Sequence, residues 1–277
     1  MYQSFKVVSC TPAGRKRYVE LLSRYLLAQR HLIDRHIWWM NTEVAEDVEY
    51  LQSLERDYPD FFQCLYLPPG QVQSAYYSVH KFFPLCSTDE DTVYIRFDDD
   101  IVWMAPEAVE RLLAFRIDHP EFFLVYPGIV NNAICTHIFQ RRTAIDMSHG
   151  FAPYTSFGPA WEQGEFAEDT HRTFLKALEA GDIHRFQFGE WVFTEYERVS
   201  INCICWFGRD FRIFNGTVGV EDEQILSCDV TRILSRFNAM CGDALVSHFA
   251  FGPQREHMDR TDILEKYAVF APEIVAP

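Results

Sequence analysis

The chain has 277 residues, of which 48% are hydrophobic and 23% charged, a balance that suits a folded protein with a full core and argues against disorder. Its net charge is -15 and its pI is near 5.0, and it lacks the clusters of Lys and Arg that hold nucleic-acid phosphates. The N-terminus does not read as a signal peptide and no long apolar run occurs, so we expect a cytoplasmic protein with no membrane span and no nucleic-acid partner.

The first half of the chain alternates between strand and helix patterns. Short apolar runs rich in β-branched and aromatic residues predict strands at residues 5–10, 35–42, 61–67, 91–97 and 122–128. Apolar residues at helical spacing predict helices over residues 15–32, 46–59, 71–83 and 106–117. Strands that are nearly continuously apolar and alternate with helices predict an α/β fold, with a mostly parallel central sheet flanked by helices.

The second half is less regular. Residues 138–164 are polar, with Gly, Pro and single aromatic residues, and we interpret them as a long functional loop. The patterns that follow predict helices at 165–180 and 221–237 and strands at 188–196, 201–207, 210–214 and 243–249. After these strands we expect a polar tail.

Three consecutive aspartates, Asp98 to Asp100, come directly after the predicted strand 91–97. Two unit charges about 5 Å apart repel by about 3 kcal/mol at the effective dielectric of a protein surface, so we expect a cation beside them. Side chains alternate along a strand, which places Asp98 and Asp100 on one side, where one Mg²⁺ or Mn²⁺ ion can use both carboxylates. The alternative is an acidic turn that caps the next helix. The apolar residues on both sides of the triplet favour the metal site.

Two further motifs lie downstream. Asp222 stands in the sequence GVEDEQIL at the start of a predicted helix, and His248 follows the apolar run DALVS. Each has an ordinary structural explanation, because acidic residues cap helices and a buried histidine is often only hydrogen-bonded. The aspartates upstream favour Asp222 as a catalytic base, while the metal-binding and structural interpretations of His248 both stay open.

In order and spacing, these motifs resemble those of the GT-A glycosyltransferases, over about residues 5–250. Such enzymes carry a D-x-D motif at the end of a central strand, often with an x-E-D motif and a late histidine. The resemblance implies a Rossmann-like GT-A domain over residues 1–277, with a nucleotide-sugar-binding half at about 1–130 and an acceptor-binding and catalytic half at about 131–277. It also implies an inverting enzyme, dependent on Mn²⁺ or Mg²⁺, that moves a sugar from a nucleotide-sugar donor, a UDP-sugar by preference, to a hydroxyl of a glycan or glycoconjugate.

The resemblance also assigns roles to the motif residues. Asp100 and His248 would bind the metal, Asp98 would lie near the donor ribose, and Asp222 would deprotonate the acceptor hydroxyl. Independently of the resemblance, the chemistry of glycosyl transfer requires such groups, because the diphosphate must be neutralised as it leaves and the acceptor hydroxyl must lose its proton.

The donor nucleotide would be contacted from the ends of the first strands. Thr11 and Asn41 are the expected contacts of the base, although GT-A proteins often have an acidic residue where this chain has Asn41, so the identity of the base is left open. Arg96 shares a strand side with Asp98 and has two interpretations, a contact to the donor phosphate or an internal salt bridge to the aspartates.

The acceptor would bind at the polar segment 140–165. Tyr154 and Trp161 are candidates for stacking on a sugar and His149 for bonding its hydroxyls, and the alternative is that the aromatic residues only pin the loop. We interpret the basic run 15–17 as a solvated helix face.

Two other functions stay open. A nucleotidyltransferase that makes nucleotide-sugars has a similar layout, but such enzymes usually carry a Gly-rich basic loop after the first strand, and SCTPAGRKR contains only Gly14. The other is a non-catalytic sugar-binding protein on the same fold.

Overall fold

The computed structural model describes residues 1–72, 75–86, 88–148, 150–214 and 217–273, and within them nine strands form one sheet. They are β1 (Lys6–Ala13), β2 (Arg35–Met40), β3 (Phe62–Leu65), β4 (Thr92–Phe97), β5 (Ile101–Met104), β6 (Val125–Val130), β7 (Glu190–Val192), β8 (Cys203–Phe207) and β9 (Ala239–His248). The strand order is β3-β2-β1-β4-β8-β6-β9-β5, and β7 pairs with β9. Strands β3, β2, β1, β4, β6 and β9 run in one direction and β8, β5 and β7 run against them, so the sheet is mixed and mostly parallel, as predicted.

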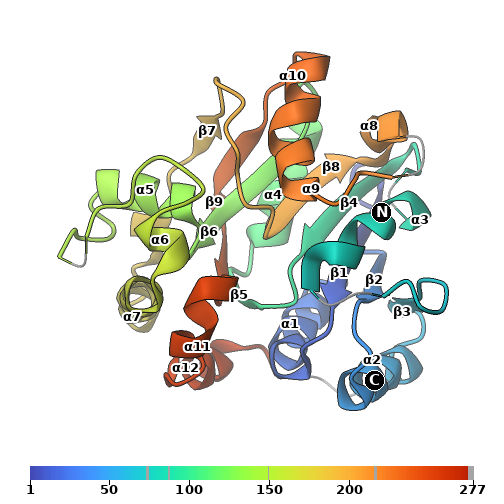
Figure 1. Cartoon of the computed structure of the whole chain (residues 1–277), viewed down its shortest axis with the longest axis horizontal. Coiled ribbons are helices and arrows are strands. Elements are labelled where there is room, and N and C mark those ends of the chain that lie inside the picture. Colours follow the sequence, from blue (N-terminus) through green and yellow to red (C-terminus); the bar gives the residue numbers. More distant parts are fainter. Residues whose placement is uncertain (73–74, 87, 149, 215–216, 274–277) are drawn as a thin grey trace.

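Helices flank the sheet on both sides (Figure 1). The α-helices are α1 (Lys16–Ala28), α2 (Ala45–Asp57), α3 (Phe83–Cys86), α4 (Ala108–Asp118), α5 (Ala133–Arg141), α6 (Pro159–Glu162), α7 (Gly164–Glu179), α8 (Gly208–Phe211), α9 (Asp222–Gln224), α10 (Val230–Leu234), α11 (Arg255–Met258) and α12 (Ile263–Phe270). Short turns of other helical types are η1 (Ala75–Lys81), η2 (Ile183–Phe186), η3 (Arg212–Phe214), η4 (Ile225–Asp229) and η5 (Gly252–Gln254). Within the described ranges, no helix has the length and apolar character that crossing a bilayer requires.

The central strands are buried along their whole length. Every residue of β4, β6 and β8 is buried, since helices or loops cover both faces of the sheet. Their Val, Ile, Phe, Tyr and Trp side chains fit the pleated surface of a covered strand. Asp98 and Asp100, which follow β4, and Asn202, which precedes β8, line a solvent-accessible cavity.

Most of the predicted strand and helix order is confirmed, and the misses lie mainly in the second half. Residues 210–214, predicted as a strand, form the turns α8 and η3, because the Phe211 ring packs on Trp206 at 4.6 Å and closes a compact aromatic turn. The expected polar tail is also wrong. Its helices α11 and α12 bury Met258, Ile263 and Tyr267 against the core.

The segment 138–164 is a loop only in part. Helix α5 occupies its start, and the signal was the N-cap residue Asn132, whose side chain accepts a hydrogen bond from the Cys135 amide. The predicted helix 221–237 consists of α9, η4 and α10 and ends at Ser235, which adopts a left-handed conformation.

Candidate functional site

The turn between β4 and β5 carries the three aspartates, and β9 brings His248 beside them. Strand β9 pairs antiparallel with β5, so that Ile101 is opposite His248, and the Phe249 amide donates to the Asp100 carbonyl at 2.8 Å. Ligand atoms of Asp98, Asp100 and His248 all lie within 4.8 Å of one another, a spacing that one metal ion can bridge.

The imidazole of His248 is oriented by the backbone. Its Nδ1 lies 3.3 Å from the Asn131 carbonyl, and because a carbonyl only accepts, Nδ1 carries the proton. Its Nε2 faces Oδ1 of Asp100 at 3.4 Å. A backbone carbonyl that fixes the tautomer in this way is typical of metal-binding histidines.

Asp100 is buried among cations. Its Oδ2 lies 3.1 Å from a guanidinium nitrogen of Arg15 and 3.1 Å from one of Arg255. Burial alone would raise the pKa of Asp100, but Arg15, His248 and Arg255 together hold that pKa well below its ordinary value. The carboxylate is thus ionised at neutral pH, and its Oδ1 is turned toward His248.

Asp98 and Arg96 form a second ion pair at the C-terminal end of β4. Arg96 Nη2 donates to Asp98 Oδ1 at 2.7 Å, and the side-chain amide of Asn202 donates to Asp98 Oδ2 at 3.2 Å. Arg96 also lies 3.6 Å from Oδ2 of Asp222. The salt-bridge interpretation of Arg96 is thus present in the structure, and its Nε and Nη1 have no hydrogen-bond partner among the described residues.

Asp222 begins α9 and is buried. Its Oδ1 accepts a hydrogen bond from the Glu223 amide at 2.9 Å, while its Oδ2 has no hydrogen-bond partner within the described part of the chain. Burial raises the pKa of Asp222 to about 6, with Asp98 and Glu223 adding to the rise and Arg96 opposing it. A carboxylate with this pKa and an oxygen that accepts no hydrogen bond is suited to accept a proton near neutral pH.

These groups line one hollow of about 520 Å³, which we call the carboxylate-arginine cavity. Its charged lining residues are Arg15, Arg96, Arg198 and Arg255 together with Asp98, Asp100, Glu221, Asp222 and Glu223. Buried atoms that lack a hydrogen bond in the described ranges include Arg15 Nη1 and Arg255 Nε besides those of Arg96 and Asp222. An unpaired buried polar group costs about 1 to 3 kcal/mol, so this cavity is organised for a polar ligand.

The remaining predicted residues lie in different places. Thr11 is fully buried within β1, and Asn41 follows β2, where its side-chain oxygen accepts from the Ser78 hydroxyl. Neither is among the lining residues of the carboxylate-arginine cavity. Trp161 does line it, whereas Tyr154 lines a separate hollow. His149 lies outside the described residues.

Sequence reasoning missed several of the lining residues. The interpretation of Arg15 as part of a solvated face is wrong, because its guanidinium pairs with Asp99 and Asp100, and Asp99 also accepts from the Gly14 amide at 3.2 Å. Arg255 was hidden in the supposed polar tail. The signal available for Arg15 was its position at the end of β1, the strand next to β4, because neighbouring parallel strands end at the same sheet edge.

Comparison with known proteins shows the fold. No protein-family model and no curated protein sequence matches the chain. Among solved structures, residues 1–349 of TarS from S. aureus, a glycosyltransferase, match with a TM-score of 0.51 at 10% identity, over 97% of this chain and 67% of that one. A mycobacterial protein matches with a TM-score of 0.50 at 10% identity, over 96% of this chain and 75% of that one. A CMP-2-keto-3-deoxy-manno-octonic acid synthetase complexed with CTP has a TM-score of 0.49 at 9% identity, covering 96% and 98%.

The chain therefore has a Rossmann-like α/β fold of the GT-A type, as the sequence motifs predicted. At these identities the similarity is one of fold. It does not choose between glycosyl transfer and nucleotidyl transfer, and it gives no metal.

Proposed function

We propose that this protein is a metal-dependent, inverting glycosyltransferase that moves a sugar from a nucleoside-diphosphate donor to a hydroxyl acceptor. The observation that carries the proposal is the placement of Asp222 in the same cavity as Asp98, Asp100 and His248. Its Oδ2 has no hydrogen-bond partner among the described residues, and its pKa is raised to about 6. One hollow thus offers a proton acceptor, a cation site and several arginines. These are the groups that displacement of a nucleoside diphosphate by a hydroxyl needs.

The donor atoms fit a hard divalent ion. Asp98 and Asp100 supply carboxylate oxygens and His248 supplies Nε2, a set that suits Mn²⁺ more readily than Mg²⁺, which prefers oxygen ligands alone. When bound, such an ion neutralises charge on the diphosphate oxygens of the leaving group. Oδ1 of Asp100 is the oxygen available to it, since Arg15 and Arg255 occupy Oδ2.

The side chains of this protein would carry the remaining steps. Asp222 Oδ2 takes the proton from the acceptor hydroxyl, whose oxygen forms the new bond to the anomeric carbon as the bond from that carbon to the diphosphate breaks. Arg15 and Arg255 lie beside Asp100, where the diphosphate would bind, and each keeps a buried guanidinium nitrogen without a hydrogen bond for its oxygens. Arg96 holds Asp98 in place and adds positive charge next to Asp222.

The acceptor would enter along an aromatic wall. Phe157 and Trp161 line the cavity with their rings 5.8 Å apart, and Phe251 links them to His248 with ring distances of 6.1 Å and 4.6 Å. Flat apolar faces of this kind stack on sugar rings. This favours the sugar-binding interpretation of Trp161 over a role in pinning the loop.

Product analysis tests the proposal. The protein is incubated with a panel of nucleotide-sugars, with Mn²⁺ or EDTA, and the nucleotide products are separated by chromatography. Metal-dependent release of nucleoside diphosphate from one donor is the expected result. Pyrophosphate formed from a nucleoside triphosphate and a sugar phosphate would identify a nucleotidyltransferase instead, and the absence of both reactions would favour a non-catalytic sugar-binding protein.

A further inference from the structure

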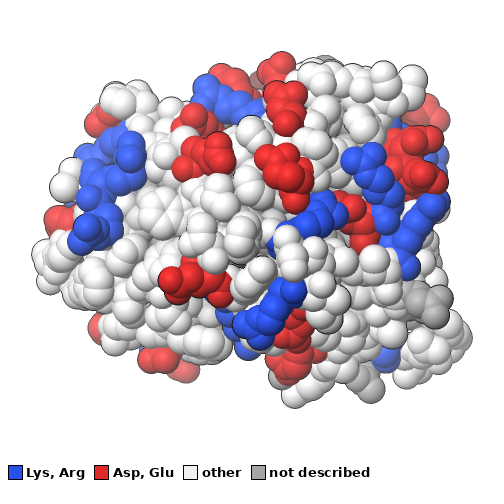
Figure 2. All heavy atoms as spheres, turned by 90° about the horizontal axis from the view of Figure 1, so that it is seen from above, with Lys and Arg blue, Asp and Glu red and all other residues white. Residues whose placement is uncertain are grey.

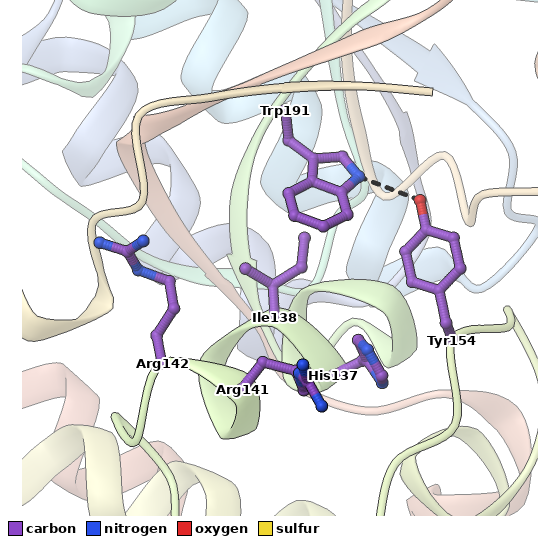
Figure 3. A pocket seen from close by; sticks show the side chains of 6 residues that line it. All are labelled: His137, Ile138, Arg141, Arg142, Tyr154 and Trp191. Carbon is purple, nitrogen blue, oxygen red and sulfur yellow. Dashed lines mark hydrogen bonds between the residues drawn. The ribbon is translucent and has the colours of Figure 1, made fainter. Parts of the chain in front are cut away.

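A second hollow lies on the outer side of α5, formed by side chains that the proposed reaction does not use. It has a volume of about 550 Å³ and is lined by His137, Ile138, Arg141, Arg142, Tyr154 and Trp191. Figure 3 shows the two aromatic rings on one side and the two arginines on the other. We call the group of His137, Arg141, Arg142, Tyr154 and Trp191 the aromatic-basic site.

The aromatic half of this site is held rigidly. Trp191 Nε1 donates to the Tyr154 hydroxyl at 3.0 Å (Figure 3). That hydroxyl lies 3.3 Å from Oε1 of Glu197, to which it donates. The His137 ring packs against Tyr154 at 5.4 Å, and its Nδ1 donates to the Ala152 carbonyl at 2.8 Å. Trp191 is still 37% exposed, so part of its ring surface is open to a ligand.

The basic half has no acidic partner in the part of the chain that the structure describes. Arg141 and Arg142 are exposed, and neither forms an ion pair with any described residue. An adjoining hollow of about 700 Å³ shares both arginines and adds Arg185, and none of its lining residues is acidic. Figure 2 shows Lys and Arg side chains gathered at the left end of the molecule, the end at which α5 lies in Figure 1. In a chain of net charge -15, such a patch creates a local field that attracts anions.

We propose that the aromatic-basic site binds an anionic saccharide, a sugar chain that carries carboxylate or phosphate groups. A sugar ring stacks on Trp191 beside Tyr154, and the anionic group pairs with the guanidinium groups of Arg141 and Arg142. An aromatic face alone would accept neutral sugars and arginines alone would accept any small anion. Their combination at one hollow selects a ligand that has both features.

The site is also placed to hold the distal part of a long acceptor. One loop supplies Tyr154 to the aromatic-basic site and, three residues later, Phe157 to the carboxylate-arginine cavity. A chain whose hydroxyl lies near Asp222 can therefore extend along this loop toward the arginines. That the anionic saccharide is the acceptor rests on the proposed function, whereas its binding at this site does not.

Direct binding measurements with defined oligosaccharides test the inference. The probes are a hexamer of galacturonic acid, maltohexaose carrying a 6-phosphate, and neutral maltohexaose, each labelled at the reducing end. Comparing the first two distinguishes a carboxylate from a phosphate ligand. The protein is expected to bind at least one charged hexamer more tightly than neutral maltohexaose, and this preference should weaken as salt is added.

Two matched double variants locate the binding. Arg141→Gln with Arg142→Gln should lower affinity for the charged hexamer by roughly tenfold or more, because hydrogen bonds to charged groups contribute on this scale. Arg30→Gln with Arg56→Gln removes the same charge from two exposed arginines elsewhere and should leave affinity unchanged. Trp191→Ala should weaken binding of charged and neutral hexamers alike.

Three results would overturn the inference: equal affinity for charged and neutral hexamers, no loss in the Arg141 and Arg142 variant, or tighter binding of a single-stranded RNA of equal charge. Nucleoside-diphosphate binding with Mn²⁺ is measured on the same samples. If the nucleotide binds and no hexamer does, the inference fails while the proposed function stands. If a hexamer binds and no nucleotide does, the proposed function fails by itself.

Discussion

The carboxylate-arginine cavity and the aromatic-basic site hold their arginines in opposite states. In the cavity, Arg15 and Arg255 lie beside Asp100, Arg96 pairs with Asp98, and a further ion pair joins Arg198 Nε to Glu223 at 2.7 Å. In the aromatic-basic site, Arg141 and Arg142 have no carboxylate partner among the described residues. The first set of charges is paired before any ligand binds, whereas the second set is left for a ligand to pair with.

Burial explains the difference. A buried charge must be paired, because leaving it unpaired costs several kcal/mol, whereas an exposed arginine stays hydrated at little cost. We therefore expect substitutions in the cavity to change chemistry, metal use and stability together. Substitutions in the aromatic-basic site should change ligand affinity alone, and the experiments below compare the two regions in these terms.

The largest effect on the transfer rate is expected for a substitution of Asp222. Asp222→Asn removes the proton acceptor and should lower the transfer rate by about 10³-fold, the usual scale for a general base. Affinity for nucleoside diphosphate and Mn²⁺ should change little, because the proposed metal ligands are Asp98, Asp100 and His248 and do not include Asp222. Rates come from product chromatography and affinities from calorimetry. If nucleotide affinity falls in parallel with rate, Asp222 has a structural role and the assignment as base is wrong.

A smaller effect is expected at the metal ligands. Asp100→Asn should weaken Mn²⁺ binding by about 100-fold. Mutating a residue that hydrogen-bonds a metal ligand typically lowers metal affinity by about 10- to 100-fold, and loss of the ligand itself should reach the upper end of that range. It also leaves Arg15 and Arg255 without their shared carboxylate, so nucleoside diphosphate should still bind in EDTA. Calorimetry with and without Mn²⁺ measures both. If wild-type affinity for the nucleotide is the same in Mn²⁺ and in EDTA, the arginines neutralise the diphosphate by themselves.

The next effect is on the pH profile, where the transfer rate should fall by about tenfold for each pH unit below the pKa of the catalytic base. Burial raises the pKa of Asp222 to about 6, so the carboxylate is protonated below that pH and cannot accept a proton, and the rate should fall there and level off above it. Arg96 opposes this rise in pKa, so Arg96→Gln should move the acidic limb to higher pH. An acidic limb that stays in place in Asp222→Asn would assign the titration to another group.

The site residues that stand at the ends of buried strands were predictable from the sequence. A run such as Thr92–Phe97 is apolar enough to specify a buried strand, and a covered strand leaves Asp98 to Asp100 at the sheet edge. His248 also ends a strand, β9, but the resemblance to GT-A enzymes singled it out, and its metal-binding and structural interpretations both stayed open. For the aspartates local pattern and topology agree, so position in the sequence was sufficient.

Apart from Arg96, the arginines of both regions were not predicted, for physical reasons. A charge run such as 15–17 gives no local indication of whether a distant carboxylate will meet it, and Arg15 is paired only because β1 and β4 are neighbours. Arg255 follows β9 in a segment whose helices are short, so its position beside Asp100 has no clear signal in the local pattern. The aromatic-basic site joins α5 to β7, two elements about 50 residues apart, and no spacing rule connects them.

The smallest expected effect is on the free energy of unfolding, compared between one arginine variant from each region. Arg255→Gln removes one of the cations beside buried Asp100 and should lower the free energy of unfolding by about 2 kcal/mol, since a bond to a charged group is lost. Arg142→Gln removes an exposed, unpaired charge and should change it by less than about 0.5 kcal/mol. Urea denaturation followed by tryptophan fluorescence measures both. A larger loss for Arg142→Gln would mean that this arginine has an acidic partner in solution, and the aromatic-basic site would then lack the free positive charge on which its preference for anions depends.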